Sequence, residues 1–139
     1  MIIRHPHRHT HASQYWIAAL HNAHAAGDTD RGAGLLSDLA YQAAWRRDHA
    51  SAASILTHAL TRAHHPAVRC LLHLRLARTM AAQNERRATL RALTAAEQHL
   101  GDAGTDRPAW CAWVSDAVMR SVDLFQRGSV SRLPCCLAA

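Results

Sequence analysis

Four histidines alternate with other residues near the start of the chain, and imidazole is a side chain well suited to binding metal. They are His5, His7, His9 and His11. Imidazoles at every second position of an extended segment can bring two or three nitrogens to one zinc, nickel or copper ion. One interpretation is a segment that captures metal or responds to pH. The other, which we favour, is a disordered basic arm over residues 1–12 that binds zinc or nickel only adventitiously. We therefore predict no resident cofactor.

The rest of the sequence contains no arrangement typical of an enzyme. It has no GxSxG, no HExxH, no phosphate-binding loop and no dinucleotide fingerprint. The four cysteines, Cys70, Cys111, Cys135 and Cys136, do not have the CxxC spacing of a zinc site. The enzyme class stays open, but the balance favours a protein that binds without catalysing, and we predict no catalytic residue.

The elements that must position any site are helices. The 139 residues include 29 alanines and 16 leucines but only six glycines and four prolines, which favours one all-helical domain. Apolar residues recur at three- and four-residue steps in six segments. The predicted helices cover residues 13–26, 29–47, 49–64, 66–82, 85–100 and 107–127. The predicted domain thus covers residues 13–128, and residues 129–139 are expected to form an irregular tail.

A repeat of 37 residues relates these segments to one another. This displacement superimposes Ala40 on Ala77 and Leu56 on Leu93, and a second one carries Ala77 onto Val114. Small residues at such positions let the backbones of two helices approach closely, and leucines fill the space between neighbouring hairpins. Repetition at this period is typical of stacked helical hairpins.

One pattern in this repeat resembles a tetratricopeptide repeat. It reads Leu36-x2-Leu39-Ala40-x2-Ala43-x8-Ala52-x3-Leu56-x2-Ala59. The resemblance implies about six antiparallel helices stacked as hairpins in a short right-handed solenoid, with alanine, leucine and methionine where that family has aromatic residues. Three further segments, residues 15–20, 24–28 and 35–43, resemble the helical C-terminal domain of actinobacterial helix-turn-helix regulators. That second resemblance implies a role in transcription regulation. It does not imply direct sequence-specific DNA binding, because only about a dozen residues precede the first helix.

The tetratricopeptide resemblance also implies a binding groove. In such stacks the first helix of each hairpin lines the concave face, and the register places six residues there. They are Tyr41, Trp45, Arg78, Cys111, Ser115 and Met119. A groove of aromatic residues and methionine with one arginine suits a peptide with a carboxylate, or an apolar ligand. We expect a peptide or protein partner; the alternatives are a small apolar metabolite, bound by a sensor or a cofactor-free enzyme, and a fragment that dimerises with full-length regulators.

Charge and hydropathy exclude some locations and partners. The formal net charge is +6 with histidine neutral, and twelve histidines make the chain more basic in mild acid. No apolar run reaches the roughly 18 to 20 residues of a membrane span, and no export signal is visible, so we expect a cytoplasmic protein. The arginine clusters at 46–47 and 86–91 are distributed, which favours a solvated surface over a nucleic-acid interface. Apolar faces on the first and last helices favour a homodimer.

Overall fold

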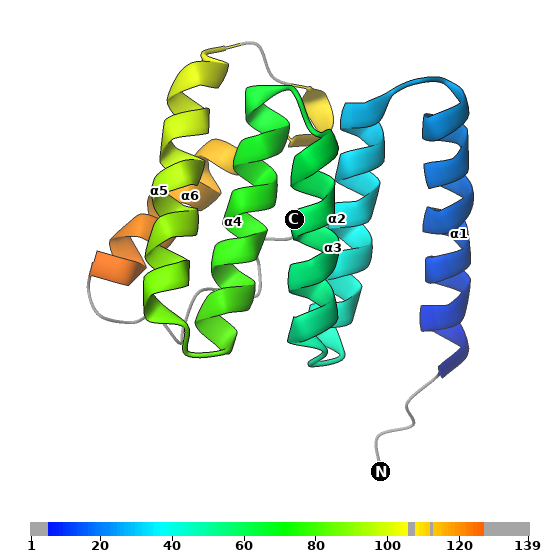
Figure 1. Ribbon diagram of the computed structural model, residues 1–139, viewed down its shortest axis with the longest axis horizontal. Helices are drawn as coiled ribbons and strands as arrows, with labels where there is room; N and C mark the ends of the chain where they lie inside the picture. The colour runs from blue at the N-terminus through cyan, green and yellow to red at the C-terminus, as the bar shows by residue number, and fades with distance from the viewer. Residues whose placement is uncertain (1–5, 106–107, 112, 127–139) are drawn as a thin grey trace.

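The computed structural model describes residues 6–105, 108–111 and 113–126, and the regular elements in these ranges are helices (Figure 1). The elements are α1 (Pro6–Ala25), α2 (Thr29–Trp45), α3 (His49–Arg62), α4 (Pro66–Ala82), α5 (Arg86–Ala103), the 3-10 turn η1 (Ala109–Cys111) and α6 (Val114–Gln126). The predicted all-α fold of six helices is confirmed. None of these helices is long and apolar enough to cross a membrane.

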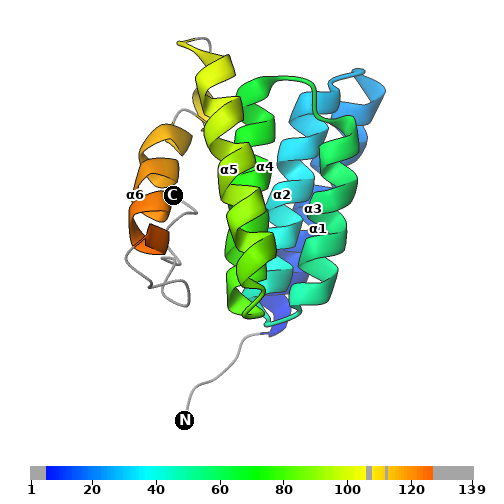
Figure 2. The same cartoon turned by 60° about the vertical axis from the view of Figure 1, so that its left-hand side comes forward.

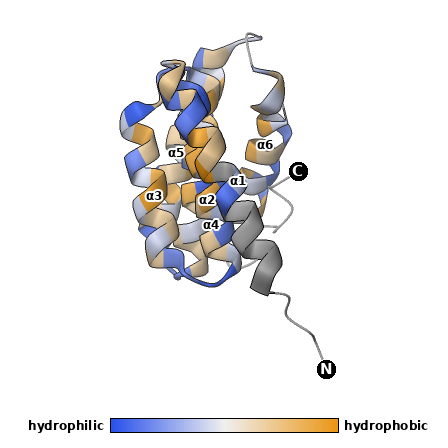
Figure 3. Cartoon of the chain, turned by 90° about the vertical axis from the view of Figure 1, so that its right-hand side faces the viewer, coloured by the Kyte–Doolittle hydropathy of each residue, from blue (hydrophilic) through white to orange (hydrophobic). Residues whose placement is uncertain are grey.

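Neighbouring helices pack as antiparallel hairpins, as the short connections predicted. The pairs α2–α3 and α4–α5 form two hairpins, α3 packs against α4, and α1 packs on α2. The first helices of the two hairpins, α2 and α4, also contact each other. Figures 2 and 3 show α6 and α3 on opposite sides of the row formed by α2 and α4. The face of α2 and α4 that points away from α3 is therefore the face on which α6 lies.

Three helix ends share one turn geometry. Gly27, Arg47 and Asn84 have positive φ angles of 70°, 64° and 58°. In each turn the next amide donates a 2.9 Å hydrogen bond to the carbonyl five residues earlier, which is the bond of a Schellman motif. The residue that donates is Asp28, Asp48 or Glu85. The turn therefore also supplies an acidic residue at the start of the following helix. Arg47 and Asn84 lie 37 residues apart, which is the period of the repeat.

Arg47 occupies a backbone conformation that favours glycine, which gives a first prediction. The left-handed region costs an L-residue about 1 to 2 kcal/mol, whereas glycine adopts it freely at a smaller entropic cost. We expect Arg47→Gly to raise the free energy of unfolding by about 0.5 to 1 kcal/mol. The matched control is Arg46→Gly, where φ is −79° and no such strain exists. Urea denaturation measures both, and a loss of stability in Arg47→Gly would contradict the prediction.

Three helix boundaries differ from those predicted. Helix α1 begins at Pro6, well before residue 13, because proline fits the first turn of a helix. Helix α5 runs through Gly101 and ends at Gly104, whose φ of 55° glycine adopts readily. Helix α6 begins at Val114 because residues 109–111 form the turn η1. The predicted tail over residues 129–139 lies outside the described residues.

Leucine, valine and alanine fill two clusters of buried side chains. One lies between the two hairpins and includes Leu56, Val68 and Leu72. The other lies among α4, α5 and α6 and includes Leu74 and Val118. These five side chains are at most 1% exposed. Of the small residues of the repeat, Ala40, Ala52, Ala59 and Ala77 are buried in these clusters, and Ala43 is partly buried against one of them.

Candidate functional site

Two arginines of α4 lie against one aromatic ring of α2. The guanidinium carbons of Arg75 and Arg78 lie 5.5 and 5.3 Å from the centre of the Tyr41 ring. The Tyr41 and Trp45 rings lie one helical turn apart, with centres separated by 6.5 Å. Arg75 also lies 6.0 Å from the ring of Trp113, just before α6. We refer to Tyr41, Trp45, Arg75, Arg78 and Trp113 as the Tyr41 cluster.

The repeat explains why these side chains meet. Asp38 and Tyr41 of α2 lie 37 residues before Arg75 and Arg78 of α4, so they occupy equivalent positions in the two hairpins. Because α2 and α4 contact each other, equivalent positions face one another across the boundary between hairpins. Trp45 follows Tyr41 by four residues and therefore extends the same face of α2. A regular stack thus places two aromatic rings and two cations together.

Arg75 is buried and holds the cluster together. Its side chain is only 10% exposed, and its Nη1 donates to the Ser37 hydroxyl at 2.7 Å and to the Asp38 carboxylate at 3.0 Å. Its Nε is buried and has no hydrogen-bond partner among the described residues. Burial lowers the pKa of the Arg75 guanidinium, and the nearby Asp38 carboxylate opposes that shift. Arg75 therefore cross-links the two hairpins. Its guanidinium donors are only partly satisfied, because within the described part of the chain Nη1 is hydrogen-bonded and Nε is not.

Arg78 and Trp45 form the accessible part of the cluster. Arg78 is half-buried, and no carboxylate in the described part of the chain forms an ion pair with it. The Trp45 side chain is 61% exposed. With two guanidinium groups and one carboxylate, the local charge is positive, and the exposed Trp45 extends the same cluster. Such a surface suits an apolar or aromatic group that carries negative charge.

The structure brings together only part of the predicted groove. Tyr41, Trp45 and Arg78 are in the cluster. Cys111 is fully buried in the core, and its thiol donates to the Pro108 carbonyl at 3.4 Å, so it does not line a surface. On α6, Ser115 is half-buried and Met119 is 64% exposed.

Four residues of the site were not among the predicted groove residues. They are Ser37, Asp38, Arg75 and Trp113. Arg75 and Asp38 carried a signal that could have found them, because they occupy equivalent positions of the 37-residue repeat and bear opposite charges. Opposite charges at equivalent positions of neighbouring hairpins predict an ion pair wherever those positions face each other.

Trp110 anchors the segment that delivers Trp113 to the cluster. Its ring lies directly on Gly34 of α2, and a Cβ atom at position 34 would lie 2.7 Å from two of the ring carbons. The Arg31 guanidinium lies 5.1 Å from the centre of the same ring. Trp110 is half-buried, and it packs against both buried clusters. Gly34 thus leaves room on α2 for an indole ring that fixes η1 in place.

The predicted metal-binding histidines cannot be placed as a site. His5 lies outside the described residues, and of His7, His9 and His11 only the helical backbone is described. Over the ranges that the structure does describe, no group of three or more histidine, cysteine or acidic side chains is placed to hold a metal ion.

A pair of histidines lies between α4 and α5. The His73 and His99 rings are stacked, with centres 5.3 Å apart and planes inclined by 9°. Burial, followed by the charges of His99 and Arg69, lowers the pKa of His73 to about 4. Burial and Arg69 also lower the pKa of His99, whereas Asp102 raises it. The pKa values of both histidines are lowered overall, which favours a neutral pair in the folded protein.

The His73 pair gives a prediction for stability against pH. In the unfolded chain His73 binds a proton below about pH 6.5, but in the folded chain only below about pH 4. Stability should therefore fall as pH decreases from about 6.5 to 4, because the unfolded state then binds more protons. His73→Phe should flatten this fall, while substitution of the exposed His58 of α3 should not. Urea denaturation at several pH values checks this, and equal slopes for wild type and His73→Phe would contradict it.

Comparison of the chain with protein-family models, with curated proteins and with solved structures finds no match. The function inferred for this protein therefore depends on the Tyr41 cluster and on the surfaces around it.

Proposed function

We propose that the face formed by α2, α4 and the start of α6 binds a peptide or protein partner without catalysing a reaction. We further propose that the hairpins stack as tetratricopeptide-like repeats. The recurrence of one turn geometry 37 residues apart, at Arg47 and Asn84, supports that stacking. The link to bacterial transcription regulation rests on the resemblance of residues 15–20, 24–28 and 35–43 to domains of helix-turn-helix regulators.

The observation that carries the proposal is that the exposed Trp45 indole and the Arg78 guanidinium both lie near the Tyr41 ring, and no described carboxylate forms an ion pair with Arg78. Tryptophan, tyrosine and arginine dominate the binding energy of protein interfaces. The Tyr41 cluster contains all three, and Trp45 is 61% exposed. Because Arg75 of α4 donates to Ser37 and Asp38 of α2, a buried side chain links the two helices beside the aromatic rings. A preorganised surface loses little side-chain entropy when a partner binds.

Partner capture tests this proposal. The immobilised protein is incubated with lysate of its source cells, and captured proteins are quantified for wild type, Trp45→Ala and Arg78→Ala. The matched control is Leu90→Ala, because Leu90 is an exposed apolar residue of α5, outside the cluster. We expect both cluster variants to lose at least tenfold in affinity, which corresponds to about 1.4 kcal/mol or more. Equal capture by all variants, or a loss in Leu90→Ala alone, would contradict the proposal.

A further inference from the structure

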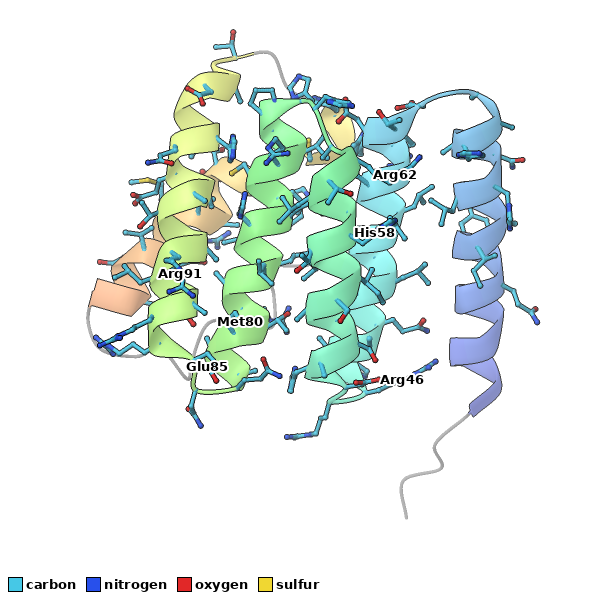
Figure 4. The ribbon with its side chains drawn as sticks, viewed as in Figure 1. Arg46, His58, Arg62, Met80, Glu85 and Arg91 are labelled. Carbon is cyan, nitrogen blue, oxygen red and sulfur yellow. The ribbon has the colours of Figure 1, made fainter. Side chains whose placement is uncertain are left out.

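One end of the bundle gathers arginines that are distant in the sequence. The α2–α3 turn and the α4–α5 turn lie at the same end, where Arg46 and Glu85 mark them in Figure 4. The first turn contains Arg46 and Arg47, and α5 begins at the second turn with Arg86 and Arg87. Arg91 follows one helical turn later. All five side chains are exposed, and we call them the basic end.

Arginines outnumber carboxylates at this end. The two turns and the first residues of α5 contain Arg46, Arg47, Arg86 and Arg87, and the carboxylates there are Asp48 and Glu85. Asp48 is engaged at the start of α3, where its carboxylate accepts the Ser51 amide at 3.2 Å. No carboxylate of the described ranges forms an ion pair with Arg46, Arg47 or Arg87. In the sequence, the arginine clusters at 46–47 and 86–91 looked distributed because about 40 residues separate them. The fold brings the two clusters to the same end of the bundle.

The chemistry of these side chains favours one kind of polyanion. Guanidinium groups bind phosphate oxygens in a bidentate geometry. Trp45, which is 61% exposed, immediately precedes Arg46 and adds a flat aromatic face to the basic end. Proteins that bind single-stranded nucleic acid combine a basic surface with aromatic rings on which bases stack. Arg46 and Arg47 lie in the α2–α3 turn, whereas Arg86, Arg87 and Arg91 lie at the start of α5. Because the charges come from two hairpins and not from one helix face alone, they suit contact with the phosphate backbone.

We propose that the basic end binds the phosphate backbone of single-stranded nucleic acid without sequence preference, with Trp45 as a stacking surface. The proposal goes beyond the partner-binding face and depends on different arginines. Arg75 and Arg78 contribute to the Tyr41 cluster, whereas the five arginines of the basic end would contact phosphates. A strand crossing both turns meets two pairs of guanidinium groups, one from each hairpin.

Fluorescence polarisation with a labelled 20-nucleotide oligouridylate tests the proposal. We expect wild type to bind, and Arg46→Gln/Arg47→Gln and Arg86→Gln/Arg87→Gln each to lose at least tenfold in affinity. The slope of log affinity against log salt should fall in magnitude by about 0.7 for each phosphate contact removed. Trp45→Ala should weaken binding without changing that slope. Arg78→Ala should leave this slope unchanged, because Arg78 belongs to the Tyr41 cluster and not to the basic end. That result separates this proposal from the partner-binding face.

The matched control is Arg62→Gln/Arg120→Gln, which removes the same charge from exposed or half-buried positions outside the basic end. Circular dichroism verifies that every variant is folded. Equal losses in this control and in the two test variants would overturn the proposal, because binding would then follow net charge alone. Absence of oligonucleotide binding by wild type at 50 mM salt would also overturn it. So would binding to phosphatidylserine vesicles without binding to the oligonucleotide, because it would identify a membrane surface as the ligand.

Discussion

Replacement of Arg75 by methionine should lower the free energy of unfolding by about 2 to 3 kcal/mol. Methionine keeps much of the length and apolar volume of the arginine stem but removes its donors. The Ser37 hydroxyl, which is fully buried, would lose the donor that lies 2.7 Å away. Asp38 would lose its ion pair, although its 39% exposure lets water replace part of that interaction. Tyr41 and Trp113 would also lose the cation that lies against both rings.

The control for this substitution lies one turn away on the same helix. Arg78→Met removes the other cation that lies against the Tyr41 ring. Because Arg78 is half-buried and forms no ion pair with a described carboxylate, we expect the free energy of unfolding to fall by less than about 1 kcal/mol. Urea denaturation measures both variants. A double-mutant cycle with Asp38→Asn isolates the coupling between Arg75 and Asp38. If Arg75→Met unfolds at the same urea concentration as wild type, Arg75 is not the cross-link between hairpins described above.

Alanine at Gly34 should destabilise the protein by about 1 to 3 kcal/mol, against the intrinsic preference of a helix for alanine. The new methyl group would lie 2.7 Å from two carbons of the Trp110 ring, so the ring and η1 must shift. Trp113 follows η1 and should move with it, away from Arg75. Near-ultraviolet circular dichroism, which reports on tryptophan packing, should change together with the urea midpoint.

Gly32 of the same helix provides the matched substitution. A Cβ atom there would meet only Leu20 Cδ1 at 3.6 Å, an ordinary contact, so Gly32→Ala should raise stability by up to about 1 kcal/mol. A second control removes the obstacle: in a Trp110→Leu background, Gly34→Ala should no longer destabilise. If alanine is equally favourable at both glycines, the close contact with Trp110 does not hold η1 on α2.

The sequence predicted the helices well where local signals agree. Helices α2, α3 and α4 begin at or beside the predicted residues because Asp28, Asp48 and Pro66 mark their starts. Predictions were poorer where a local signal was ambiguous. Gly101 suggested a helix end, yet α5 continues past it to Gly104, because a glycine inside a helix costs only about 1 kcal/mol relative to alanine. The helix predicted over residues 107–127 begins only at Val114, because the short turn η1 occupies residues 109–111.

The site was predicted less completely because its main residue is buried by distant neighbours. Arg75 reads as one of several surface arginines, and only the packing of α2 on α4 brings Ser37 and Asp38 to it. The expected groove position of Cys111 followed from helical register, but residues 109–111 form a 3-10 turn that directs Cys111 into the core. The basic end likewise depends on two turns meeting at one end of the bundle. Local periodicity cannot reveal such tertiary neighbours.

Site-specific photo-crosslinking tests the central claim, that the face containing the Tyr41 cluster binds a partner. Benzoylphenylalanine is introduced at Trp45 in one protein and at Leu90 in another, since both positions carry exposed apolar side chains and lie on different helices. Each protein is irradiated in lysate of its source cells, and crosslinked products are identified by mass spectrometry. The predicted result is a discrete crosslinked protein from position 45 that is absent from position 90 and disappears when Arg78→Ala is added. The same products from both positions, or products unaffected by Arg78→Ala, would contradict the claim.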